Sequence, residues 1–95
     1  MKEYVYFNRK GAEKGYFSHF LVFYLLQRLA LSTIKVDTEW IIITTYSNMA
    51  KEYSLKLLQT KKYVKELTDR GYITKSKYGN RLRIVVKDSD LVKFP

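Results

Sequence analysis

The residues whose types and spacing most clearly suggest a chemical role are eleven lysines and arginines between positions 51 and 87. They are Lys51, Lys56, Lys61, Lys62, Lys65, Arg70, Lys75, Lys77, Arg81, Arg83 and Lys87, opposed only by Glu52, Glu66 and Asp69. The net charge of the chain is +9, and +8 of it lies in this segment. Because ammonium and guanidinium groups bind phosphates, the segment favours a nucleic-acid partner. A solvated basic face without a partner is the alternative interpretation.

Other kinds of chemistry find little support in the sequence. The absence of cysteine excludes a disulfide framework, a thiolate metal site and a cysteine nucleophile. His19 is the single histidine, and the carboxylate pairs Asp37/Glu39 and Asp88/Asp90 have no third ligand nearby. The glycines form no phosphate-cradling pattern. We therefore expect a protein that is not an enzyme, with no metal, no cofactor and no small-molecule ligand.

The length and composition predict one soluble domain of 95 residues. We expect an N-terminal strand and loop over 1–15, a core over 16–87 and a C-terminal tail over 88–95. The most apolar window, 16–31, is too short to span a bilayer and contains charged and polar residues. The N-terminus lacks the apolar stretch of a signal peptide. These features predict a cytoplasmic, DNA-associated protein with no membrane partner.

Several elements must position the basic segment. In the first half we expect a strand over 4–7, a polar loop over 8–15, and a helix from a Ser18 N-cap to about Leu31. A polar link over 32–39 leads to a strand over 40–44 (WIIIT). The helix is apolar on nearly every side, so it is either the central core helix or part of a subunit interface. For the interface we choose Phe20, Phe23 and Tyr24 as dimerisation residues.

In the second half, Thr45 or Ser47 can cap a short helix that ends at Glu52. Ser54 is expected to cap a longer helix over 55–70, whose core face comprises Tyr53, Leu57, Thr60, Val64 and Leu67. Gly71 stands at the position that follows a helix end. Two strands, 72–77 and 81–87, are joined by Tyr78-Gly79-Asn80, a sequence suited to a tight hairpin turn.

From Ser18 to Lys87 the chain resembles winged helix-turn-helix domains. The resemblance lies in WIIIT, a short capped helix, a basic helix ending in KELTDRGYI (65–73), and a basic hairpin. It is similar to the N-terminal domains of plasmid and phage replication initiators, and to small partition and repressor proteins of mobile elements. The resemblance implies an α+β fold of three helices with a C-terminal β-hairpin wing, extended here by an N-terminal strand. Many members have a small or glycine-containing turn where this chain has Tyr53-Ser54-Leu55.

The longer helix is the candidate for major-groove contact. On its outward arc, Gln59 can pair with adenine, and Lys62 can reach guanine acceptors or phosphate. The neighbouring cations suit the backbone: Lys56, Lys61 and Lys65. Leu58 also points outward, where a thymine methyl contact or a dimer contact would explain it.

The hairpin supplies the remaining candidate DNA-binding residues: Lys75, Lys77, Tyr78, Asn80, Arg81 and Arg83. A basic ribbon beside a recognition helix straddles phosphates or places an arginine in the minor groove, and Arg81 adjoins the turn. A charged edge hairpin protected from aggregation is the alternative.

These residues predict a homodimer that binds double-stranded DNA sequence-specifically, as a transcriptional regulator or a replication or partition protein of a plasmid or virus. The alternative is a protein-interaction module without nucleic-acid contact. Binding to RNA or single strands is disfavoured, because most aromatic residues lie at 4–7 and 17–24, away from the basic segment.

Overall fold

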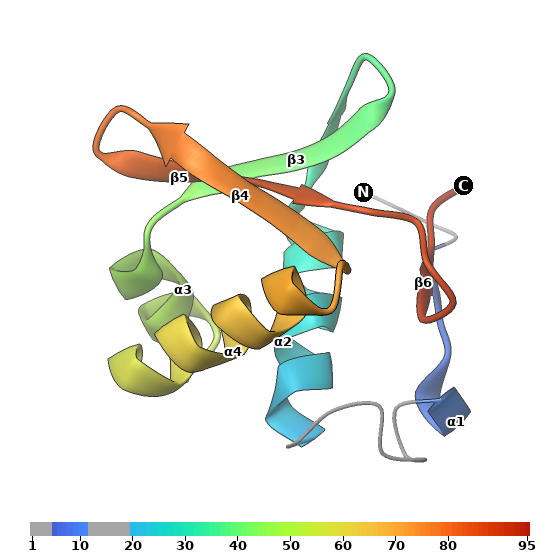
Figure 1. The fold of residues 1–95 in the computed structure, drawn as a ribbon, viewed down its shortest axis with the longest axis horizontal. Coiled ribbons are helices and arrows are strands. Elements are labelled where there is room, and N and C mark those ends of the chain that lie inside the picture. The colour runs from blue at the N-terminus through green and yellow to red at the C-terminus, as the bar shows by residue number, and fades with distance from the viewer. Residues whose placement is uncertain (1–4, 12–19) are drawn as a thin grey trace.

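A four-stranded antiparallel sheet lies on one side of three helices in the computed structural model (Figure 1), which describes residues 5–11 and 20–95. The strand order is β2-β3-β5-β4, built from Ile34–Val36, Glu39–Thr44, Arg81–Val86 and Ile73–Tyr78. The helices are α2 (Phe20–Ser32), α3 (Tyr46–Glu52) and α4 (Leu57–Asp69). The chain is therefore an α+β domain. The expected Ser18 cap lies outside the described residues.

The helix α2 forms the centre of the hydrophobic core. Six of its residues are at most 1% exposed, namely Val22, Phe23, Leu25, Leu26, Leu29 and Ala30. They pack with buried side chains of α4 and the sheet. The core of a single copy therefore covers most of the apolar surface of α2, which agrees with the interpretation of α2 as the central core helix.

The segment from 32 to 39 is not the polar link that we expected. Ile34–Val36 forms strand β2, which pairs antiparallel with β3, so that Ile34 lies opposite Ile41 and Val36 opposite Glu39. Asp37 begins the two-residue turn with a φ of 57°. Aspartate tolerates this left-handed conformation, so a tight hairpin forms although Lys35 and Asp37 give the segment a polar composition.

The short helix α3 begins as expected from Thr45. Its hydroxyl accepts a hydrogen bond from the Asn48 N–H at 3.0 Å. The expected Ser54 cap of α4 is wrong. The helix begins at Leu57, after Lys56, and Ser54 lies in the preceding turn with a φ of 58°. Ser54 thus adopts the left-handed conformation usually taken by glycine, which explains how the turn forms without one.

The buried face of α4 differs from the expected one at two positions. Thr60, Val64 and Leu67 are buried as predicted, but Leu57 is 42% exposed and Tyr63 is buried. The later start of the helix places Leu57 in its first turn, outside the packed stripe.

The end of α4 follows the expected pattern. Gly71 has a φ of 82°, and the N–H groups of Gly71 and Tyr72 donate to the carbonyls of Thr68 and Leu67. These two bonds are those of a Schellman motif. The hairpin that follows is also confirmed, with Gly79 at a φ of 63° as the first residue of a two-residue turn.

The expected strand over 4–7 is confirmed at Tyr6–Phe7, and both chain ends contain further structure that the sequence did not predict. Within the expected loop over 8–15, Arg9–Gly11 forms a single helical turn, α1, and the Gly11 N–H donates to Asn8 Oδ1 at 3.1 Å. The expected tail over 88–95 contains β6 (Val92–Lys93), which pairs with β1 (Tyr6–Phe7). Leu91 and Val92 are fully buried, so burial of apolar side chains holds this end of the chain against the core.

Candidate nucleic-acid interface

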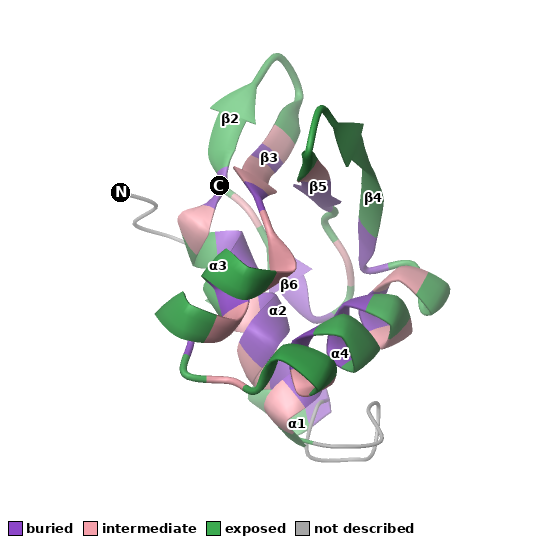
Figure 2. Cartoon of the chain, turned by 90° about the vertical axis from the view of Figure 1, so that its left-hand side faces the viewer, coloured by how far each residue is buried: buried purple, intermediate pink, exposed green. Residues whose placement is uncertain are grey.

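The exposed surface of α4 carries most of the helix residues predicted to bind DNA. Lys61, Lys62 and Lys65 are exposed, and Leu58, at 78%, is the most exposed large apolar side chain among the described residues. The buried stripe of Thr60, Tyr63, Val64 and Leu67 fixes which side of α4 faces the core, so these residues share the outer surface. Figure 2 shows this surface of α4 beside α3 and β4.

Gln59 lies on a different flank of α4 from Lys61. At about 100° per residue, positions 59 and 61 are roughly 160° apart around the helix. The Gln59 side chain is partly buried, and its Oε1 accepts a hydrogen bond from the Lys56 N–H at 3.3 Å. Gln59 therefore satisfies a backbone donor at the start of α4, a role that sequence reasoning missed.

The pairing of β4 with β5 divides the hairpin residues between the two faces of the sheet. Lys75 lies opposite Ile84 and Lys77 opposite Leu82, so both lysines share the face that packs on the helices. Arg83 lies opposite Ile43 on the other face, where Tyr78 lines the same hollow as Arg83. The register thus separates Lys75 and Lys77 from Tyr78 and Arg83, although all four are close in sequence.

The first residue of α3 brings the hairpin and α4 together. The Lys75 Nζ donates to the Tyr46 hydroxyl at 2.9 Å and lies 5.7 Å from the centre of the ring. The Lys61 Nζ lies 5.8 Å from the same ring centre. Sequence reasoning did not select Tyr46, because nothing in its immediate neighbours distinguishes it from a core aromatic residue.

Only some of the predicted cations have acidic partners. Lys65 pairs with Asp69 at 2.7 Å, and Arg83 Nη2 pairs with Glu39 at 2.9 Å. The hydrogen bond from Lys65 to Asp69, reinforced by the carboxylate charge, raises the pKa of the Lys65 ammonium. Within residues 5–11 and 20–95, no ion pair involves the other predicted cations: Lys56, Lys61, Lys62, Lys75, Lys77 and Arg81. These six charges are available to an anionic ligand.

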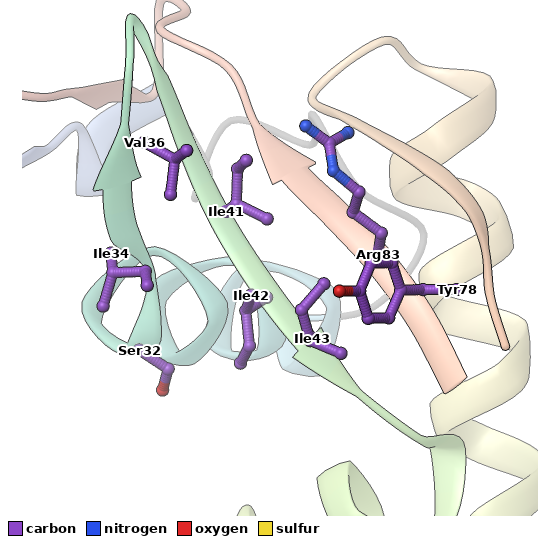
Figure 3. A pocket seen from close by; sticks show the side chains of 8 residues that line it. All are labelled: Ser32, Ile34, Val36, Ile41, Ile42, Ile43, Tyr78 and Arg83. Atoms are coloured by element: carbon purple, nitrogen blue, oxygen red, sulfur yellow. The ribbon is translucent and has the colours of Figure 1, made fainter. Parts of the chain in front are cut away.

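The sheet face opposite the helices carries an apolar hollow (Figure 3) of about 490 Å³. Its walls include Ile34, Val36, Ile41 and Ile43, with Tyr78 and Arg83 at one side. Ile34 is 67% exposed and Tyr78 is 59% exposed. This surface differs in character from the basic one, because its exposed area is mainly aliphatic.

The residues chosen for dimerisation have different surroundings. Phe23 is 1% exposed within the core of its own chain, and Tyr24 is partly buried, with its hydroxyl donating to the Tyr53 carbonyl at 3.1 Å. Phe20 is 57% exposed. Leu31, 46% exposed, lies eleven residues later, which places it on nearly the same side of α2 as Phe20. Phe20 and Leu31 are thus exposed on one side of α2, and the partly buried Tyr24 lies on the same side.

The described part of the chain contains neither a cluster of metal-binding side chains nor a membrane-spanning helix. No three potential metal-binding side chains lie together in residues 5–11 and 20–95. In the same residues, every helix is too short or too polar to cross a lipid bilayer.

Comparison with known proteins adds no relative. No protein-family model matches the chain, and neither a curated protein nor a solved structure matches it.

Proposed function

We propose that this chain is a winged helix-turn-helix protein that binds double-stranded DNA sequence-specifically. The observation that carries the proposal is the meeting of α4 and the β4–β5 hairpin beside Tyr46, with unpaired cations on both elements. The element order supports the fold assignment, because α2, the β2–β3 hairpin, α3, α4 and the β4–β5 hairpin follow one another, and β5 lies between β3 and β4. In this interpretation α4 is the recognition helix and the hairpin is the wing.

The exposed surface of α4 suits the major groove. Lys62 reads guanine acceptors, and the neighbouring Leu58 suits the methyl group of thymine. We leave Gln59 out of the base-reading set, since its side chain caps the helix. Lys56, Lys61, Lys75 and Lys77 bind backbone phosphates, and Arg81 enters the minor groove from the end of the hairpin, beside Asn80. Lys65 is held by its ion pair with Asp69.

A homodimer is part of the proposal. The exposed Phe20 and Leu31 support it, because a second copy packed along α2 would cover these side chains and the remaining exposed part of Tyr24. Phe23 makes no contribution in this arrangement, since it is already buried. Two copies related by a twofold axis bind two half-sites about 10 bp apart.

Selection from a random duplex library tests the proposal. A recovered sequence of two inverted half-sites supports sequence-specific binding by a dimer, and a single half-site contradicts the dimer. Lys62→Ala and Arg81→Ala should each weaken binding to the selected site without changing the thermal melting temperature, because both side chains are exposed. Binding as tight as that of the unmodified protein would show that these surfaces are wrongly assigned.

A protein-interaction module is the second candidate. The aliphatic hollow beside β2 favours it, since exposed apolar surface is typical of protein contacts. Salt dependence separates the two candidates. Phosphate contacts from Lys56, Lys61, Lys75 and Lys77 predict a log–log slope of about −3 to −4 for the affinity against salt concentration, at about 0.9 for each phosphate. No duplex binding even at low salt would favour the interaction module.

A further inference from the structure

We propose that Tyr46 organises Lys61 of α4 and Lys75 of β4 into a binding site for one phosphodiester group of the DNA backbone. The inference rests on the proposed function and specifies how the recognition helix and the wing would hold the same strand. We call Tyr46, Lys61 and Lys75 together the Tyr46 site. Figure 1 shows the elements that meet there, with the turn of the β4–β5 hairpin above the start of α3.

The Tyr46 side chain contacts two ammonium groups that come from different elements. The Lys61 ammonium lies 5.8 Å from the ring centre, within the range of a cation–π interaction. The Lys75 ammonium, 5.7 Å from the ring centre, lies beyond the hydroxyl group in the direction of the C–O bond. The Tyr46 hydroxyl also accepts a hydrogen bond from Lys75. Two flexible side chains from different elements are thereby positioned before a ligand arrives, which reduces the entropy lost on binding.

The charge of the Tyr46 site calls for an anion. No described carboxylate forms an ion pair with Lys61 or Lys75. A hollow of about 310 Å³ adjoins Tyr46, and Lys77, Arg81, Asn80 and the Gly79 backbone line it. A phosphodiester carries one negative charge and can accept hydrogen bonds from two ammonium groups. The adjacent hollow gives the DNA strand a path from the Tyr46 site to the hairpin turn.

The consequence for recognition is that the position of the protein along the DNA duplex is fixed. A phosphate held by Lys61 and Lys75 together ties α4 and the hairpin to one point on the backbone, and phosphate contacts of this kind set how a protein sits on the duplex. Lys62, the next residue after Lys61, is then positioned over a defined base pair.

The test measures the salt dependence of duplex binding for Lys61→Gln, Lys75→Gln and the double variant. If both lysines bind the same phosphate, the double variant should lower the slope by about 0.9, the value of one phosphate. A decrease of about 1.8, the value of two phosphates, would overturn the shared site. Lys93→Gln on β6 is the control, since it removes the same charge from a different part of the fold.

Tyr46→Leu tests the organising role of the ring at unchanged net charge. We expect roughly a two- to fivefold loss of affinity, the value of one exposed cation–π interaction. Tyr6→Leu on β1, where the side chain is 57% exposed, is the matched control and should bind DNA as the unmodified protein does. Unchanged affinity of Tyr46→Leu would remove Tyr46 from the proposal.

A second measurement identifies the phosphate directly. Neutral methylphosphonate is placed at one phosphate at a time in the selected duplex. One position should weaken binding of the unmodified protein but leave the Lys61/Lys75 double variant unaffected. If each lysine responds to a different phosphate, the shared site is wrong and the proposed function stands. If the unmodified protein binds no duplex, the proposed function itself fails, and the shared site fails with it.

Discussion

Removing the carboxylate of Asp69 should strengthen DNA binding by releasing Lys65. The two side chains form a 2.7 Å ion pair on the exposed surface of α4, four residues apart. In Asp69→Asn the Lys65 ammonium loses this partner, and its raised pKa falls back toward the ordinary lysine value. An ordinary lysine titrates near about 10.4, so Lys65 stays fully charged at neutral pH.

The expected size follows from counting phosphates. One additional phosphate contact steepens the log–log salt slope by about 0.9. Between 50 and 200 mM salt, this corresponds to an additional loss of affinity of about 3.5-fold compared with the unmodified protein. Stability should not fall, because the ion pair is exposed and Asp69 is an unfavourable negative charge at the C-terminal end of α4.

The assay is fluorescence anisotropy of a labelled duplex at four or more salt concentrations. Asp90→Asn is the matched control, since it raises the net charge equally at an exposed position outside α4. If the two variants show the same slope, then Lys65 does not face the DNA and the proposed orientation of α4 is wrong.

Two further predictions concern the folded state. Ser54→Gly should stabilise the protein by about 0.5 kcal/mol in urea denaturation, because a left-handed φ costs a non-glycine residue about 1 kcal/mol or more, partly offset by the entropy of glycine; destabilisation would contradict the turn geometry. Tyr53→Phe should cost about 1 kcal/mol at neutral pH, since the Tyr53 hydroxyl donates to Ser32 Oγ at 3.0 Å. Burial raises the pKa of the Tyr53 phenol above 10.0, so its contribution is complete below that pH and is lost as the pH rises through the folded-state pKa. Stability curves measured from pH 8 to 11 should therefore fall less steeply for Tyr53→Phe, and identical curves would exclude this role for Tyr53.

The elements with strong local signals could be predicted from the sequence. The WIIIT strand, the Thr45 cap, the end of α4 at Gly71 and the Gly79 turn all depend on residues close in sequence. The strand β2 was missed because it is only three residues long and one of them is a lysine. Its pairing with β3 is what defines it as a strand. The strand β6 was missed because it pairs with β1, some 85 residues away in the chain.

The candidate surface was only partly predictable. Helical periodicity correctly predicted that Lys62 is exposed and Val64 is buried, but α4 begins later than expected, so Leu57 is exposed instead of buried. Gln59 was assigned to base reading because its cap to the Lys56 N–H cannot be recognised before the first residue of the helix is known.

The amino-acid sequence alone determined where the charge lies, because net charge is a property of composition and most of it falls between residues 51 and 87. It also determined the turns at Gly71 and Gly79, since the backbone angles of these turns depend on single residues. Only the tertiary structure decided which charges lie together. Strand register placed Lys75 and Lys77 on the helix side of the sheet, away from Arg83, and packing brought Lys61 and Lys75 to Tyr46. These contacts join residues from three separate elements, and no local sequence pattern encodes contacts between residues that are far apart in the chain.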